Sequence, residues 1–122
     1  MNKQRGKFGE DIACRYFERR GYVVMHRNWT THWGELDLIM RDSACLVFIE
    51  VKFRSNQNYG DVVYSLHFYK LRALSRSIEA YLFKYPTIKA WRFDVFTITK
   101  LGSTYQVQHF KDFPLQSQRA YY

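Results

Sequence analysis

The stretch from Leu46 to Phe53 constrains the fold of this 122-residue chain more than any other. Successive side chains of a β-strand point to opposite faces, and apolar residues here fill most positions of both faces. Such a strand belongs in the middle of a sheet, where both faces are covered. It nevertheless carries Glu50 and Lys52, which share one face because they are two residues apart. Two charges in such a strand are costly unless they are paired or hold an ion.

The rest of the chain predicts two helices and four more strands. Apolar residues recur at helical spacing from Lys7 to Arg20 and again in the segment that follows Gly60 and ends at Tyr85. Alternating or β-rich stretches predict strands at 22–27, 35–41, 91–98 and 104–110, and a polar stretch predicts a loop at 28–34. The order helix, three strands, helix, two strands predicts an α/β fold in which the second and third strands form a hairpin.

Length and composition predict one domain over residues 1–122. The chain is 47% hydrophobic and 19% aromatic, which is enough to build a core, and residues 111–122 are expected to form a flexible tail because they show no periodicity. Cys14 and Cys45 are not spaced for zinc and are expected to be buried, reduced thiols. The longest apolar run, 44–49, is too short to span a bilayer, and the N-terminus does not resemble a signal peptide. We therefore expect a cytoplasmic location and no membrane partner.

The charge balance favours a polyanionic partner. Nineteen Lys and Arg against 11 Asp and Glu give a net charge of +8, which is typical of nucleic-acid-binding domains, although charge can also serve solubility alone. Arg54, Arg72 and Arg76 lie among aromatic residues, a mixture that can hold phosphates and stack on unpaired bases.

Asp37 adds a second carboxylate to the predicted sheet. On its strand we expect Leu36, Leu38 and Met40 to share one face and Asp37 to lie on the other. A hairpin would bring Asp37 beside the strand that carries Glu50, which follows it by 13 residues. Two converging carboxylates suit a hard cation such as Mg²⁺ better than zinc.

The remaining charged candidates leave alternatives open. Glu50 and Lys52 could instead form a simple ion pair at the solvated end of their strand. Glu10 lies at the margin of the first helix's apolar face, so it either reaches the carboxylates or is a first-turn residue stabilised by the helix dipole. Lys70 is either a phosphate contact or a lysine whose stem covers apolar helix surface.

Several short motifs together resemble a known family. They are Gly9-Glu10-Asp11-Ile12-Ala13, Gly21-Tyr22, Arg27-Asn28-Trp29, Gly34-Glu35-Leu36-Asp37-Leu38-Ile39, Phe48-Ile49-Glu50-Val51-Lys52-Phe53-Arg54, Lys70 and Arg92-Phe93-Asp94-Val95. In this order and spacing, from about Lys7 to Ile98, the chain resembles the YraN-like family of uncharacterised bacterial proteins.

That resemblance implies a restriction-endonuclease-like fold of the PD-(D/E)XK group, with a mixed β-sheet flanked by helices, similar to archaeal Holliday-junction resolvases. It implies that Asp37 and Glu50 occupy the metal-ligand positions, Lys52 the lysine position and Glu10 the acidic position of the first helix. Leu36 stands where the group's name has proline.

The leading hypothesis is a Mg²⁺- or Mn²⁺-dependent endonuclease that acts on DNA, branched or partly single-stranded. Asp37, Glu50 and Lys52 are its expected catalytic residues, and Glu10 is a further expected metal ligand. The expected nucleic-acid contacts are Arg54, Lys70, Arg72 and Arg76. The alternatives are a non-catalytic nucleic-acid-binding accessory protein and a protein interaction module with a structural acidic cluster. A homodimer is compatible with each of them.

Overall fold

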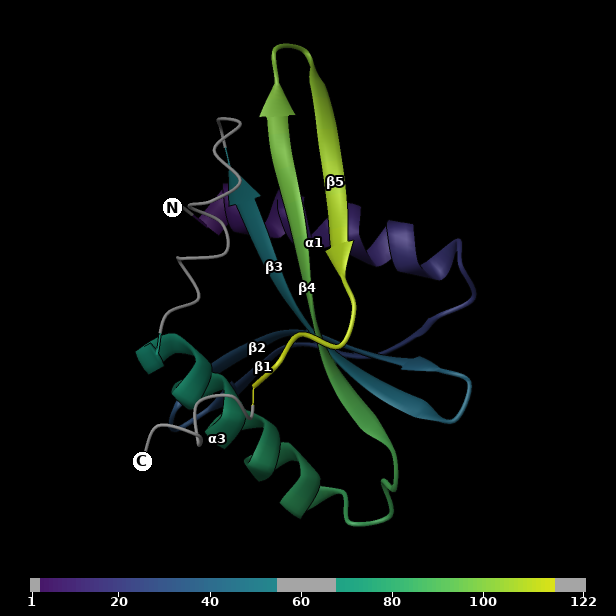
Figure 1. Cartoon of the computed structure of the whole chain (residues 1–122), viewed down its shortest axis with the longest axis vertical. Helices are drawn as coiled ribbons and strands as arrows, with labels where there is room; N and C mark the ends of the chain where they lie inside the picture. The colour runs from purple at the N-terminus through teal and green to yellow at the C-terminus, as the bar shows by residue number, and fades with distance from the viewer. Residues whose placement is uncertain (1–2, 55–67, 116–122) are drawn as a thin grey trace.

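A five-stranded mixed sheet with a helix against each face forms the protein, as Figure 1 shows for the computed structural model. The structure describes residues 3–54 and 68–115. Its elements are α1 (Lys3–Glu18), β1 (Val23–Thr31), β2 (Gly34–Asp42), β3 (Cys45–Arg54), α3 (Phe68–Lys84), β4 (Trp91–Leu101) and β5 (Thr104–Phe110). The strands follow one another across the sheet in chain order, and only the β3–β4 pair is parallel. This confirms the predicted fold class and element order, with β3 as the central strand.

Each face of the sheet has its own apolar core. The α1 side buries Ala13, Cys14 and Phe17 of the helix against strand residues that include Leu38 and Val47. The α3 side buries another set, which comprises Leu36, Ile39, Leu46, Phe48, Leu71, Leu74, Ile78, Tyr81, Phe93, Val95 and Leu115. Because β3 contributes to both cores, its apolar residues lie on both of its faces, as its sequence predicts. No described helix has the length and apolar character needed to cross a membrane.

Gly21 ends α1 and directs the chain into the sheet. It has a φ of 89°, a conformation that favours glycine. Its amide donates to the Glu18 carbonyl, and the Tyr22 amide donates to the Phe17 carbonyl. The rings of Phe17 and Tyr22 also meet, with centroids 4.9 Å apart. These are the bonds and the apolar contact of a Schellman cap, so the helix has a defined end.

The predicted loop at 28–34 is wrong, because β1 continues to Thr31 and only His32 and Trp33 form the turn. Residues 29–31 pair with residues 34–36 of β2 in register. As an edge strand, β1 pairs only with β2 and has no fully buried residue, so its sequence is polar enough to look like a loop.

The predicted alternation of β2 is also wrong at one point. Leu36 packs in the α3-side core, whereas Leu38 and Met40 pack in the α1-side core. The backbone pairing between β2 and β3 runs from Asp42–Cys45 to Leu38–Ile49. Beyond it the carboxylate of Asp37 accepts the amide of Val51 at 3.0 Å. At this point a side chain, in place of a backbone carbonyl, accepts the hydrogen bond from a β3 amide. The two-residue alternation of side chains along β2 is interrupted there.

Three predicted segments lie wholly or partly outside the described residues. The polar stretch 55–60 lies outside, as do residues 61–67 at the start of the segment predicted to hold the second helix, and residues 116–122 of the expected tail. Residues 111–115 do lie against the sheet, since the Phe113 amide donates to the Phe93 carbonyl at 2.7 Å and Leu115 is buried.

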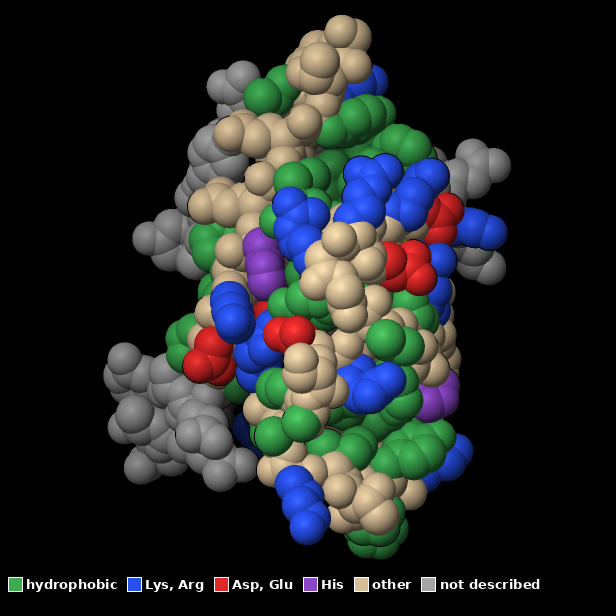
Figure 2. All heavy atoms as spheres, turned by 90° about the vertical axis from the view of Figure 1, so that its right-hand side faces the viewer, with side chains coloured by type: hydrophobic (Ala, Val, Ile, Leu, Met, Phe, Trp, Pro, Cys, Tyr) green, Lys and Arg blue, Asp and Glu red, His purple; other side chains and the backbone are tan. Residues whose placement is uncertain are grey.

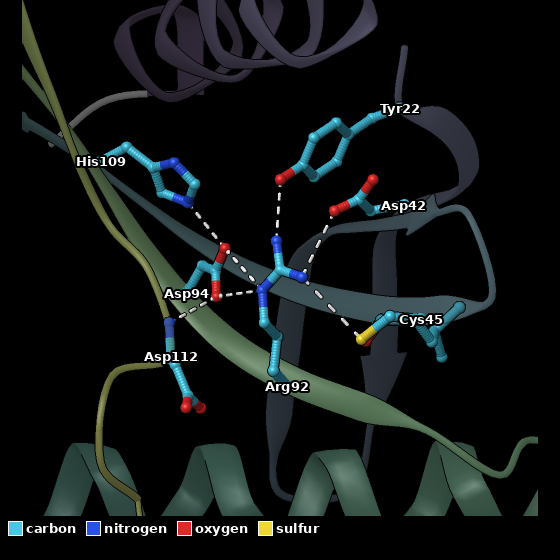
Figure 3. A network of polar contacts seen from close by, with 8 residues as sticks. Tyr22, Asp42, Cys45, Arg92, Asp94, His109 and Asp112 are labelled. Carbon is cyan, nitrogen blue, oxygen red and sulfur yellow. Dashed lines mark hydrogen bonds and ion pairs between the residues drawn. The ribbon is translucent and has the colours of Figure 1, made fainter. Parts of the chain in front are cut away.

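A buried polar network ties β4 to its surroundings (Figure 3). Asp94 is fully buried and accepts bonds from Arg92 Nε, from His109 Nε2 at 2.6 Å and from the Asp112 amide at 2.9 Å. Arg92 also donates to the Tyr22 hydroxyl, so the network reaches the chain just after α1. Burial alone would raise the pKa of Asp94, but these bonds outweigh it and lower the pKa.

The rest of the network lies at the β2–β3 turn. Arg92 contacts Asp42 at 3.5 Å and the sulfur of Cys45 at 3.9 Å. Cys45 is only partly buried, unlike the buried Cys14, and both are free thiols.

We predict that Asp94→Asn lowers the free energy of unfolding by about 3–5 kcal/mol, because it leaves the partly buried Arg92 without its main counter-ion. Urea denaturation at neutral pH measures this. Asp112→Asn is the matched control: the Asp112 side chain is exposed, only its backbone amide binds Asp94, and asparagine tolerates the φ of 56° at this position.

The lowered pKa of Asp94 means that its contribution to stability is present above the ordinary aspartate pKa and is lost as pH falls through the native pKa. The difference between the variants should therefore shrink below about pH 4. Equal stability at neutral pH would contradict the prediction.

Candidate metal centre

Four elements deliver charged side chains to one region of the molecule. α1 carries Glu10, β2 carries Asp37, β3 carries Glu50 and Lys52, and α3 carries Lys70 near its start. Figure 1 shows why they meet: the N-terminal end of α1, the C-terminal end of β3 and the N-terminal end of α3 lie on the same side of the molecule.

Glu50 is the most deeply placed of these groups, with 3% of its surface exposed. One carboxylate oxygen, Oε2, lies 3.2 Å from Nζ of Lys70 and 3.6 Å from Nζ of Lys52. The other oxygen, Oε1, is buried without a hydrogen-bond partner among the described residues. A buried, unsatisfied carboxylate oxygen is costly and calls for a further partner.

Asp37 lies beside Glu50 and is partly buried. Burial and the negative charge of Glu50 raise its pKa well above the ordinary value, and the Val51 amide opposes this only in part. A hydrogen bond between the two carboxyl groups raises the pKa of Asp37 further, since it forms only when one of them carries the proton. Without a cation, ionising both carboxyl groups therefore costs energy, because the two negative charges repel each other.

Glu10 and Glu35 complete an acidic cluster with Asp37. Carboxylate oxygens of the three residues all lie within 4.8 Å of one another. They line an open pocket of about 780 Å³ that is also lined by Arg27. Burial raises the pKa of Glu10, and the nearby charge of Glu35 acts in the same direction, while a bond to Asn28 and the charge of Arg27 oppose them.

Glu35 was not among the site residues predicted from the sequence. It lies two residues before Asp37 on the same strand, so the shared face of the two carboxylates was the signal that could have found it. Lys70 was expected to contact phosphate or to cover helix surface, and the structure places it in an ion pair with Glu50.

These residues fit a hard divalent cation. The cluster of Glu10, Glu35 and Asp37 offers only carboxylate oxygens, without nitrogen or sulfur, and the Glu50 carboxylate lies beside Asp37; such donors suit Mg²⁺ or Mn²⁺. A cation would also offset the repulsion that raises the pKa of Asp37, and it could be bound by Oε1 of Glu50, which has no hydrogen-bond partner within residues 3–54 and 68–115.

The expected nucleic-acid contacts are distributed over β3 and α3. The Arg54 backbone pairs with Thr99, and its side chain lies outside the described part of the structure. Arg72 is exposed on α3, and Arg76, one turn later, stacks over the ring of Trp33 with 4.6 Å from its guanidinium carbon to the ring centroid. Figure 2 shows Lys and Arg side chains spread over another face of the molecule, with a group of them at the level of α1.

The fold and the cluster define a small basic α/β protein with an acidic pocket lined by residues of α1, β1 and β2. Residues 9–98 match the model of the uncharacterised protein family UPF0102, and the chain belongs to this family. This confirms the resemblance stated from its motifs.

Relatives of similar length support the assignment. A UPF0102 protein of Geobacter metallireducens is 37% identical over 109 residues, which cover 88% of this chain and 89% of the relative. One from Legionella pneumophila is 37% identical over 100 residues, with 80% and 85% covered. One from Neisseria meningitidis serogroup C is 40% identical over 82 residues, with 67% and 71% covered.

We predict that Mg²⁺ or Mn²⁺ stabilises the native protein, by about 2.7 kcal/mol when the free metal is at 100 times its Kd. Asp37→Asn should lose this stabilisation, because a neutral amide is a poorer ligand for a hard dication. Thermal unfolding in EDTA and with added metal measures both effects. Glu18→Gln, which removes an exposed carboxylate at the other end of α1, is the control and should respond to metal like the wild type.

In EDTA, Asp37→Asn should be at least as stable as the wild type at neutral pH. The raised pKa of Asp37 means that its contribution to stability is present at low pH and is lost as pH rises through the native pKa. Asp37→Asn should remove that part of the pH dependence. A large loss of stability in EDTA would identify the carboxylates as a structural network instead.

Proposed function

We propose that this protein is a Mg²⁺- or Mn²⁺-dependent endonuclease that acts on DNA, branched or partly single-stranded. The observation that carries the proposal is the Glu50 carboxylate, buried beside Asp37 with Oε2 between two lysines and with no hydrogen-bond partner for Oε1 in the described part of the chain. The family resemblance supports the same roles for Asp37, Glu50 and Lys52.

The chain's own residues divide the work in this proposal. Asp37, Glu50, Glu10 and Glu35 would hold the metal. When bound there, it would lower the pKa of a water molecule and polarise the scissile phosphate. Lys52, held beside Glu50 with 18% of its side chain exposed, would orient that water or neutralise developing negative charge. Lys70, with 40% of its side chain exposed, would offer a second positive charge to a phosphate oxygen.

The net charge of +8 supports a polyanionic substrate, because Lys and Arg that neutralise phosphates release condensed counterions. The acidic pocket is compatible with such a substrate once a cation is bound. Its carboxylates would repel a phosphate when no metal is bound and attract it through the metal otherwise.

One observation favours a second candidate, a non-catalytic DNA-binding protein whose acidic cluster is structural. Both lysines already contact Oε2 of Glu50, as they would in an ion-pair network that needs no metal. The two candidates differ in turnover and in their response to metal.

Lys52→Ala should lower the cleavage rate by about 10²-fold or more while changing DNA affinity little, because a group that acts on the attacking water stabilises the transition state. The test is a cleavage screen over single-stranded, duplex, flap and four-way DNA with Mg²⁺ and Mn²⁺, alongside binding in EDTA. Lys100→Ala, at an exposed position on β4, controls for loss of one positive charge. Equal losses of rate and affinity would make Lys52 a phosphate contact. No cleavage of any DNA would leave the second candidate.

Asp37→Asn should abolish cleavage in Mg²⁺. In EDTA it should bind DNA at least as tightly as the wild type, with a gain in binding free energy of up to about 1 kcal/mol, because it removes a negative charge that faces the phosphates. Fluorescence anisotropy with labelled DNA measures the affinity, and Glu18→Gln controls for net charge. Weaker binding of Asp37→Asn in EDTA would count against a metal site.

A further inference from the structure

The turn between β1 and β2 presents a tryptophan to solvent. Trp33 is 46% exposed, although tryptophan is one of the residues that folding usually buries most. Glu35 of the acidic cluster follows it by two residues on the same hairpin. The Cα atoms of Trp33 and Glu35 are therefore roughly 7 Å apart along the hairpin.

The turn that carries Trp33 is held firmly. The Thr31 hydroxyl oxygen accepts the amides of Trp33 and Gly34 at 3.0 and 3.1 Å. It also lies 2.8 Å from the hydroxyl of Ser77, which is buried on α3. These contacts use backbone and hydroxyl groups, so they fix the tip of the hairpin against α3 without help from the indole.

Arg76 of the same helix covers part of the indole. Its guanidinium carbon lies 4.6 Å from the Trp33 ring centroid, in the range of a cation–π contact. Arg72, one turn earlier on α3, is exposed. A partly exposed aromatic ring beside a guanidinium group offers a flat surface for a base and positive charge for its phosphate.

We propose that Trp33 and Arg76 form a stacking subsite for an unpaired base of DNA, on the hairpin that also carries Glu35 of the acidic cluster. A base paired inside a duplex has both faces covered by its neighbours, whereas an unpaired base offers a free face to the indole. The subsite thus selects DNA with a single-stranded stretch. This inference rests on the proposed DNA-binding function and names the feature of DNA that the site prefers.

The experiment compares binding of a short labelled single strand and of the corresponding duplex in EDTA, where no cleavage occurs. Trp33→Ala should weaken single-strand binding by about 5- to 100-fold, the range expected for loss of one stacked base, and duplex binding by less than about twofold. Trp33→Phe should recover part of the loss, because a smaller ring still stacks. A 2-aminopurine base in the single strand should lose fluorescence on binding to the wild type and not to Trp33→Ala.

Two controls keep the result specific. Phe83→Ala removes an aromatic side chain that is 89% exposed at the far end of α3, and should leave both affinities unchanged. The melting temperature of Trp33→Ala should stay near that of the wild type, because the Thr31 bonds do not use the indole.

Other outcomes would overturn the inference. Equal weakening on both DNAs, or none, would show that Trp33 does not recognise an unpaired base. A change of oligomeric state in Trp33→Ala, with unchanged DNA affinity, would assign the indole to contact between copies of the chain. If Asp37→Asn abolishes cleavage while Trp33→Ala has no effect, only the subsite fails. If the wild type binds neither DNA, the proposed function fails with it.

Discussion

The burial of Glu50 in the middle strand is the constraint on which the candidate site depends. A carboxylate at 3% exposure must be compensated, and the structure supplies two lysines at Oε2 and none of the described donors at Oε1. Lys70 can reach it because α3 joins two parallel neighbouring strands and packs its N-terminal end near the end of β3. The crossover that completes the sheet therefore also brings a charge to the site.

The second constraint is the break in β2 at Asp37. Its carboxylate takes the Val51 amide where the backbone pairing with β3 ends, and so lies against Glu50. The same break sends Leu36 to the α3-side core, away from Leu38. The acidic pair thus coincides with an interruption of the side-chain alternation at one residue of β2. The apolar residues on either side of it pack into different cores.

Asp94 and Asp37, two acidic residues of the sheet, have opposite environments. Asp94 has donors from Arg92, His109 and the Asp112 amide, so its pKa is lowered and its position is fixed. Asp37 faces another carboxylate, and its pKa is raised. A satisfied network serves stability, whereas like charges held together are characteristic of sites that bind or react. Both groups belong to motifs from which the family resemblance was drawn.

The sequence by itself determined the fold class, the element order, the central strand and the shared face of Glu50 and Lys52, because hydrophobic periodicity and residue spacing are local properties of the chain. It also placed Asp37 on the strand next to Glu50. Only the tertiary structure decided that β1 runs through the predicted loop, that Leu36 leaves the face of Leu38, that Glu35 joins Glu10 and Asp37, and that Lys70 pairs with Glu50. These outcomes depend on strand register and on how the helices pack, and contacts between residues far apart in the chain leave no periodic signal in it.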